Sequence, residues 1–294
     1  MKIFWTKKTK LRKFYYFLGF KIGSSKNMEG IISEQIKNME CVLNNKLAEL
    51  SNKFDTKMMQ NICHANAISA LHQKTFGKYK NINQGKDVVL VGAGPTLKDY
   101  QPIKDAIHIG VNRTFQFDKI NLDYLFLLDY LNVKQYIDEA NNYRKDKCVK
   151  FYGLFSEHNH AMHIPDSEVF KANALRYYIS NSNFDLNEQF NYSIETKTLG
   201  CFWSVIFQAA QFALYTNPKR IYLAGCDCTY DVHYDNNTPL FVNKEAQKQH
   251  IQRGIDGWKK LKEFASIYYP ETEIISINPV GLKGLFKDIY TQGK

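Results

Sequence analysis

Short apolar runs recur along most of this sequence, and the residues that end them are small or polar. The six runs cover residues 88–91, 107–111, 124–128, 148–152, 221–224 and 273–277. Runs of this length, separated by segments of helical character, are typical of a parallel sheet that helices cover on both faces. We therefore predict an α/β fold with a Rossmann-like, mostly parallel sheet over residues 81–294. Residues 201–215 and 241–268 are predicted as helices of this fold.

The first apolar run is followed directly by Gly92-Ala93-Gly94-Pro95-Thr96. Glycines let a backbone turn tightly and bring its N–H groups against a phosphate or a sugar, with a helix N-terminus behind them. Pro95 suits the first turn of such a helix, where its missing N–H costs nothing. Ligands of open α/β sheets bind beyond the carboxyl ends of the strands. We predict that this turn binds a nucleotide, and a tight turn without a ligand is the alternative.

Several familiar nucleotide motifs are not met in this sequence. The third glycine of GxGxxG is missing, and the second run ends in Asn112, where a dinucleotide fold places an acidic residue for the ribose. No GK[ST] follows the turn, which excludes a P-loop. The sequence also has no DxD pair, and carboxylates often hold a cation against two phosphates. A donor with one phosphate, such as a CMP-linked sugar, is therefore favoured over a UDP-linked one, with no metal ion.

Side chains that follow the other runs are predicted to complete the pocket. Asn112 can read a base or a ribose. Arg113 can hold a phosphate or a carboxylate, although it can equally form a surface ion pair. Asp129 follows the third run, and Asp227 and Thr229 follow the fifth.

The sequence Lys197-Thr198-Leu199-Gly200 precedes the helix predicted at 201–215. Thr198 is interpreted as the N-cap of that helix, with its hydroxyl and the following N–H groups facing a ligand. Capping alone would explain the threonine. It does not explain the lysine and the glycine beside it.

Candidate catalytic side chains follow the fifth run. A histidine of near-neutral pKa can take the proton of an acceptor hydroxyl, and His250 is predicted for this role, with His233 as the alternative. Tyrosine hydroxyls can stabilise a departing phosphate. We predict that Tyr230 and Tyr234 do so, together with Lys197.

A cluster of histidines and a pair of cysteines are not predicted to bind a ligand. His158, His160 and His163 have no carboxylate or cysteine spaced to complete a metal site, so a solvent-facing loop is predicted there. Cys226 and Cys228 are interpreted as small residues that pack at the end of a strand.

Composition restricts the partners and the compartment. The chain has 294 residues, 44% of them hydrophobic, and a formal charge of +10, which favours anionic partners such as nucleotides, acidic glycans or anionic lipid. No basic stripe interleaved with aromatic residues occurs beyond the first fifteen residues, so no nucleic-acid partner is expected. The six cysteines show no CxxC spacing, and no stretch of eighteen apolar residues occurs. These features predict a cytoplasmic protein.

Residues 1–24 form a basic and aromatic segment without the small-residue cleavage site of a signal peptide. Such a mixture suits the headgroup layer of an anionic membrane, so peripheral binding at the inner face of the cytoplasmic membrane is one prediction. Docking of these aromatic residues on the chain's own domain is the other.

Residues 25–80 are predicted as an amphipathic helical region. Between Met28 and Met58, apolar side chains recur at steps of three or four residues, which places them on one face of a helix. This face either forms a coiled coil and makes the chain a homo-oligomer, or it packs against its own domain. The polar residues 78–86 that follow Gly77 are interpreted as a linker.

The order of these elements resembles a known family. Strand–GAGPTL, strand–GVNRTF and KTLGCFWSVIFQAAQFALY followed by RIYLAGCDCTYD resemble the bacterial family 42 sialyltransferases and the related motility-accessory (Maf-type) glycosyltransferases, over residues 87–280. The resemblance implies a Rossmann-like variant of the GT-A fold, a CMP-sialic acid donor and no metal.

Residue by residue, the resemblance is uneven. Gly92, Gly94, Pro95 and Asn112 match nucleotide-binding positions of the family, and Thr198 and Gly200 match a second turn. At other positions the residue differs from the one that the family has: Ala93, Asp129, Lys197, Leu199 and Thr229. His250 lies within a few positions of the family's catalytic histidine.

The leading hypothesis is an inverting, metal-independent glycosyltransferase that moves sialic acid or a related nonulosonic acid from a CMP donor to a surface glycan or glycolipid, as in lipopolysaccharide or capsule biosynthesis. Two alternatives stay open: a nucleotide-dependent diphosphokinase that uses the same glycine turn, and a non-catalytic scaffold for glycan assembly.

Overall fold

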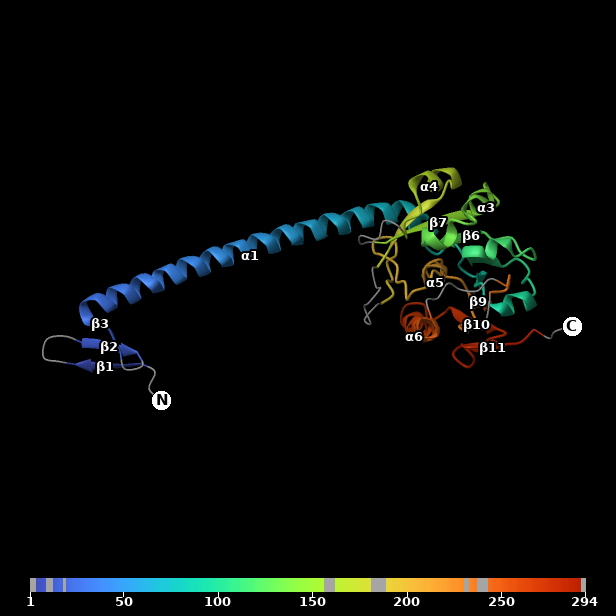
Figure 1. The fold of residues 1–294 in the computed structure, drawn as a ribbon. Helices are drawn as coiled ribbons and strands as arrows, with labels where there is room; N and C mark the ends of the chain where they lie inside the picture. Colours follow the sequence, from blue (N-terminus) through green and yellow to red (C-terminus); the bar gives the residue numbers. More distant parts are fainter. Residues whose placement is uncertain are drawn as a thin grey trace. The chain divides into compact units, whose positions relative to one another are not determined.

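The computed structural model of this chain describes residues 4–8, 13–17, 20–155, 162–180, 189–229, 233–236 and 243–291, with side chains from residue 30 onward. The chain divides into two compact units, Met1–His64 and Ala65–Lys294, which are described separately. Figure 1 labels the helices and strands. Among the described residues, none of the helices combines the length and the hydropathy that crossing a bilayer requires.

The second unit is built on an eight-stranded sheet in which every pair of neighbours is parallel. Its strands are β4 (Asp87–Val91), β5 (Ile107–Val111), β6 (Tyr124–Leu127), β7 (Val149–Phe155), β8 (Leu175–Ile179), β9 (Arg220–Ala224), β10 (Glu273–Ile277) and β11 (Lys287–Ile289). They lie in the order β11-β10-β9-β4-β5-β6-β7-β8. The predicted α/β, Rossmann-like parallel sheet is therefore confirmed.

The direction of strand order reverses between β4 and β9. From β4 the chain adds strands outward to β8 at one edge, and then returns to the other side of β4 with β9. In doubly wound sheets this reversal is the point where the loops at the carboxyl edge separate and leave a crevice. A ligand site is therefore expected at the loops after β4 and β9.

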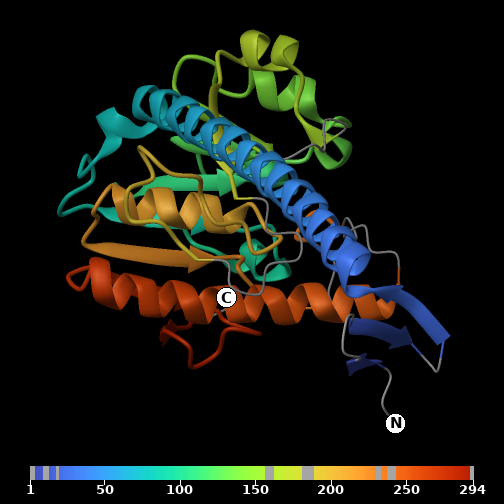
Figure 2. The ribbon, with the colours of Figure 1, turned by 90° about the vertical axis from the view of Figure 1, so that its left-hand side faces the viewer.

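Both faces of the sheet are buried, as continuous apolar strands require. Val88 and Leu90 of β4 belong to one core cluster, and Val89 and Val91 belong to the other. The helices α5 (Ile206–Tyr215) and α6 (Lys244–Tyr268) cover the first face (Figure 2). The other face is covered by α2 (Tyr130–Val133), α3 (Ile137–Asn142) and α4 (Asp166–Ala172).

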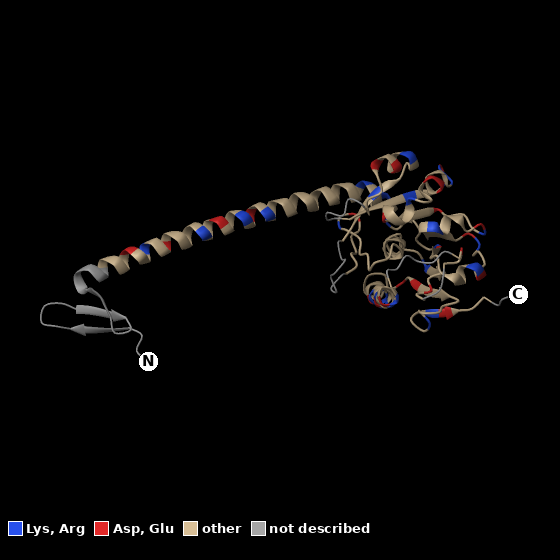
Figure 3. Ribbon diagram, in the orientation of Figure 1, with Lys and Arg blue, Asp and Glu red and all other residues tan. Residues whose placement is uncertain are grey.

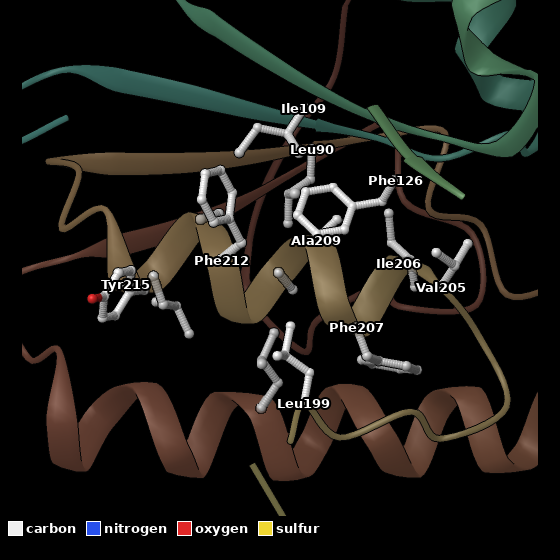
Figure 4. Packing of buried hydrophobic residues seen from close by; sticks show 14 of the residues in the cluster. Leu90, Ile109, Phe126, Leu199, Val205, Ile206, Phe207, Ala209, Phe212 and Tyr215 are labelled. Atoms are coloured by element: carbon white, nitrogen blue, oxygen red, sulfur yellow. The ribbon is translucent and has the colours of Figure 1, made fainter. Parts of the chain in front are cut away.

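Helix α5 is the central element of the first face. All ten of its residues are buried between the sheet and α6 (Figure 4). The helix was predicted over 201–215 but begins at Ile206. Phe202 and Trp203 have φ angles of 44° and 61°, in the left-handed region that a right-handed helix cannot include.

The predicted linker at 78–86 is wrong, because parts of it belong to the core. Helix α1 (Ser25–Phe76) ends inside the second unit, where Phe76 is fully buried against Phe151 and Phe212. Tyr79 is buried as well. The buried Asn83 side-chain amide donates to Thr216 Oγ1 at 3.1 Å.

The first unit begins with a small antiparallel sheet that sequence reasoning did not predict. Its strands are β1 (Phe4–Lys8), β2 (Lys13–Phe17) and β3 (Phe20–Ser24), in the order β1-β2-β3. Helix α1 follows β3 directly. The predicted membrane contact concerns side chains that lie outside the described ones.

We predict that the chain loses stability in mild acid through His72. Its Nδ1 lies 2.8 Å from the Ile194 carbonyl oxygen, and its Nε2 accepts the Tyr178 N–H at 2.7 Å, so the ring must be neutral. Burial lowers the pKa of His72. The pKa of His72 is therefore lower in the folded chain than in the unfolded chain, where it is about 6.5. The contacts of neutral His72 stabilise the fold fully above about pH 6.5, and this stabilisation is lost as the pH falls toward the pKa of the folded chain.

The measurement is the thermal unfolding midpoint of the chain between pH 8 and pH 5. The midpoint temperature should decrease as the pH drops below about 6.5. The decrease should be less steep in His72→Gln, because the glutamine amide still donates and accepts hydrogen bonds but does not titrate. An identical pH dependence in both proteins would contradict the assignment to His72.

Candidate functional site

The turns that follow β4 and β9 pass each other closely. The Gly92 N–H donates to the Ala224 carbonyl at 2.8 Å, and the Gly94 N–H donates to the Gly225 carbonyl at 2.8 Å. A Cβ atom on Gly92 would lie 2.5 Å from the Gly225 oxygen, and one on Gly94 would clash with the Asp227 carboxylate. The two glycines are therefore required by the neighbouring turn, whether or not a ligand approaches them.

Asp227 ties these two turns together. One of its carboxylate oxygens accepts the Thr96 N–H at 2.9 Å, and the other accepts the Thr96 hydroxyl at 2.5 Å. Its own carbonyl accepts the Gly281 N–H at 2.8 Å. The helix expected behind the glycine turn is a short 3-10 helix, Pro95–Asp99. Asp227 holds the start of this 3-10 helix against the end of β9.

A cavity of about 210 Å³ opens between the two turns, at the point where the strand order reverses. Eight of the predicted site residues line it: Gly92, Ala93, Gly94, Pro95, Asn112, Asp227, Thr229 and His250. Seven of them follow β4, β5 or β9 and His250 lies on α6, so the fold brings together residues that are distant in the sequence. Sequence reasoning missed other lining residues: the α5 start at Ser204–Phe207, Cys226, Cys228 and Trp258.

The N-terminus of α5 is the feature of the cavity that best suits an anion. Ser204, Val205, Ile206 and Phe207 line it, and no side chain caps the helix at Val205. A helix N-terminus carries unsatisfied N–H groups and about half a positive charge, which together suit a phosphate. No lysine or arginine lines the cavity within the described part of the chain.

Asn112 offers a second polar contact to a ligand. It adopts a φ angle of 49°, directly after β5. Its side-chain oxygen is buried and has no hydrogen-bond partner among the described residues. A buried oxygen without a donor is costly, so a ligand that donates to it would remove that cost.

Two histidines line the same cavity in the neutral form. Burial lowers the pKa of His250, and the Arg253 cation lowers it further. Burial also lowers the pKa of His233, against an opposing effect of Asp235. Both side chains are thus free of charge at neutral pH, as a general base must be.

Trp203 links His250 to Arg253. Its ring stacks on the His250 ring at 6.4 Å between centroids, and the Arg253 guanidinium lies 4.5 Å from the Trp203 ring centroid. The left-handed backbone of Trp203 is unfavourable for a bulky residue. Strained backbone of this kind is concentrated at functional sites.

A larger hollow of about 1040 Å³ adjoins the cavity along α6. The two share Cys228, Thr229 and Ile251. The hollow carries aromatic rings from Phe202 and Trp203, and polar and charged side chains of α6: Glu245, Lys248, Gln249, Gln252, Arg253, Asp256, Lys259, Lys260 and Glu263.

Some predicted residues lie elsewhere. The Arg113 Nε donates to Asp235 at 2.7 Å, and the Tyr234 hydroxyl donates to the Arg113 carbonyl at 2.9 Å. Asp129 caps α2 by accepting the Leu131 N–H at 3.1 Å. None of these three predicted residues lines the cavity. Tyr230 and the histidines at 158 and 160 fall outside the described residues.

The Lys197–Gly200 turn has a structural role and does not line the cavity. Thr198 is not the N-cap of α5, because that helix starts eight residues later. Lys197 is exposed, and Leu199 is fully buried in a parallel bridge with Ile179. The Gly200 carbonyl accepts the side-chain amides of two buried glutamines of α5, Gln208 at 2.8 Å and Gln211 at 3.0 Å.

Comparisons with known proteins leave the family of this chain open. No family model matches the chain. No curated protein matches it. Among solved structures, it is similar to a MAf glycosyltransferase from Magnetospirillum magneticum AMB-1, with 14% identity and a TM-score of 0.44. The match covers 76% of this chain and 38% of that protein, and a likeness this low transfers neither mechanism nor substrate.

Gly94→Ala should destabilise the second unit by about 1–3 kcal/mol, as expected for overpacking. The new methyl group would lie 2.7 Å from the Gly225 oxygen and against the Asp227 carboxylate. Gly254→Ala is the matched control on the same cavity, because its methyl group meets only Cys228 Sγ, at an ordinary 3.6 Å. Urea unfolding of the three proteins measures the difference, and equal stability of both variants would contradict the packing described for the glycine turn.

Proposed function

We propose that this chain is a glycosyltransferase that binds a nucleotide-linked sugar over the Gly92–Pro95 turn. The observation that carries the proposal is the cavity at the reversal of strand order. There a close glycine turn, the uncapped N-terminus of α5, a buried asparagine oxygen and two neutral histidines meet. Each supplies a function that glycosyl transfer requires. The backbone N–H groups can donate to a phosphate, and the asparagine oxygen can accept a hydrogen bond from the nucleobase or the ribose. A neutral histidine can act as general base toward the hydroxyl group of the acceptor substrate.

The donor that fits these groups is CMP-linked, with sialic acid or a related nonulosonic acid as the sugar. A helix N-terminus supplies about half a positive charge, which suits the single phosphate of a CMP-sugar better than the two phosphates of a UDP-sugar. Asn112 Oδ1 would accept from the nucleotide. Tyr230 remains a proposed donor to the leaving phosphate, whereas Lys197 and Tyr234 are replaced in this role by the start of α5.

Transfer would proceed with inversion in a single displacement, without a metal ion. His250 takes the proton of the acceptor hydroxyl as that oxygen bonds to the anomeric carbon. The bond from this carbon to the phosphate oxygen breaks, and its electron pair leaves with CMP. His233 lines the same cavity and is the alternative base.

The acceptor would lie in the larger hollow along α6, next to His250. Its aromatic rings suit the apolar face of a sugar, and the mixed polar side chains of α6 suit hydroxyl groups. The polar residues that line it run from Glu245 to Glu263 on α6, a length of about 27 Å. This length favours an extended surface glycan or glycolipid as the acceptor. Contact of the basic residues 1–24 with the inner face of the membrane remains a separate proposal.

A diphosphokinase requires carboxylates that hold magnesium against the phosphates of ATP. Asp227 is the one carboxylate that lines the cavity within the described residues, and Thr96 occupies both of its oxygens. The lining residues therefore favour the transferase over this alternative.

Thermal shift against a panel of nucleotides tests the donor. CMP and CMP-sialic acid should raise the unfolding midpoint, by an amount equivalent to about 2.7 kcal/mol at a ligand concentration one hundred times Kd. UDP, GDP, ATP and NAD should have little effect, and Gly94→Ala should abolish the shift. Stabilisation by UDP or GDP alone would overturn the CMP assignment, and no stabilisation by any nucleotide would overturn the enzyme.

A second test concerns the base. His250→Ala should lower CMP release from CMP-sialic acid by about 10²–10⁴-fold while the thermal shift by CMP is kept. Because burial and Arg253 lower the pKa of His250, the rate should stay level through neutral pH and fall only below that lowered pKa. Arg253→Gln should move this fall to higher pH. His233→Ala is the matched control, and a rate loss confined to His233→Ala would assign the base to His233.

A further inference from the structure

Helix α1 presents an apolar stripe that no described part of its own unit covers. Every residue from Gly30 to Ala67 is exposed. Eight large apolar side chains share one face of this stretch: Ile32, Ile36, Met39, Leu43, Leu47, Leu50, Phe54 and Met58. Their exposed fractions range from 37% for Ile32 to 72% for Met39. A contiguous exposed stripe of this size marks an interaction surface.

The stripe has an internal repeat of eleven residues. Ile32, Leu43 and Phe54 are spaced by eleven, and so are Ile36, Leu47 and Met58. Eleven residues make close to three turns of α-helix, so equivalent side chains return to almost the same face. Helices with this period associate as coiled coils with a slight right-handed supercoil.

The charges of this stretch favour a protein partner over a membrane. Residues 30–64 contain four lysines (37, 46, 53 and 57) and four acidic residues (34, 40, 49 and 55), so their net charge is zero. Figure 3 shows both signs spread along the helix. Amphipathic helices that lie on anionic membranes are rich in lysine and arginine on the polar face. A balanced polar face is typical of coiled coils.

Edge charges favour one orientation of the partner. At 100° per residue, Lys46 and Lys57 flank the stripe on one edge and Glu40 flanks it on the other. In an antiparallel pair of identical helices the lysine edges would face each other. In a parallel pair the lysine edge faces the edge that carries Glu40, which avoids like-charge repulsion.

We propose that α1 binds a second copy of this chain as a parallel, in-register coiled coil through the stripe from Ile32 to Met58. The same side chain then meets its own copy at each repeat, so the eleven-residue period is matched along the whole contact. This association is independent of the proposed glycosyl transfer, because no residue of the stripe lines the cavity or the hollow along α6.

The mass of the full chain in solution tests the association. At micromolar concentration, light scattering should give at least twice 34.3 kDa for the wild type and for Asn52→Asp, whose side chain lies opposite the stripe. Leu50→Asp places the same charge within the stripe and should give 34.3 kDa. An unchanged urea unfolding transition of the second unit in both variants would show that this unit is intact, whether or not CMP binds.

A wild-type mass of 34.3 kDa overturns the proposal, as does a Leu50→Asp protein of unchanged mass. If the wild-type monomer instead floats with phosphatidylglycerol vesicles and Leu50→Asp does not, the stripe is a membrane contact and the proposal also fails.

Disulfide trapping tests the orientation. Cys41 lies nine residues from Ile32, which is half a turn away from the stripe, so Cys41 should not cross-link across the contact. In a Cys41→Ser, Cys63→Ser background, Phe54→Cys should form an intermolecular disulfide under mild oxidation, because a parallel register brings the two copies of position 54 together. An antiparallel pair over the same stripe would place position 54 opposite position 36, about 27 Å from its own copy. An associated protein that forms no such disulfide overturns the parallel register.

Discussion

The close approach of the turns after β4 and β9 is the constraint on which the candidate site depends. Strand order reverses at this point, so these two turns lie side by side although they are far apart in the sequence. Glycines at 92 and 94 allow the backbones to approach, and Asp227 then joins the β9 turn to Thr96. The cavity is the space that remains beyond this junction, so its position follows from the topology of the sheet.

Helix α5 contributes its N-terminus to the cavity because two buried glutamines fix the segment before it. Gln208 and Gln211 both bond to the Gly200 backbone, which holds the incoming chain at a set distance from the helix. The chain then passes through the left-handed residues Phe202 and Trp203. The helix can therefore start beside the glycine turn, at Ile206. Two buried polar side chains, Gln208 and Gln211, thus position the backbone N–H groups at the start of α5, which no side chain caps.

The sequence predicts the sheet well because its strands are buried on both faces and their apolar runs end sharply. β8 was missed although Tyr177 and Tyr178 favour a strand, because Arg176 interrupts its apolar run. β11 was missed because it has only three residues. The start of α5 could not be predicted, since aromatic residues rarely adopt a left-handed backbone. Arg113 was assigned to the pocket because a guanidinium can hold a phosphate, but it forms the ion pair that was its alternative, with an aspartate 122 residues further along the chain, Asp235. Asp129 was assigned because it follows a strand, and its carboxylate instead accepts the N–H of Leu131, two residues further on.

Helix α6 places His250 over the cavity through a contact two turns further along. Gly257 packs so tightly on α5 that a Cβ atom there would lie 2.6 Å from the Phe207 ring. Trp258 packs on the same ring, at 5.1 Å between centroids. Because seven residues make about two turns, His250 lies on the face of α6 that Gly257 presses toward α5. The depth of that contact therefore fixes the distance from the proposed base to the N-terminus of α5. In the sequence, His250, Gly254 and Gly257 on this face are spaced by four and three residues. Helix prediction from the spacing of large apolar residues does not detect such a face.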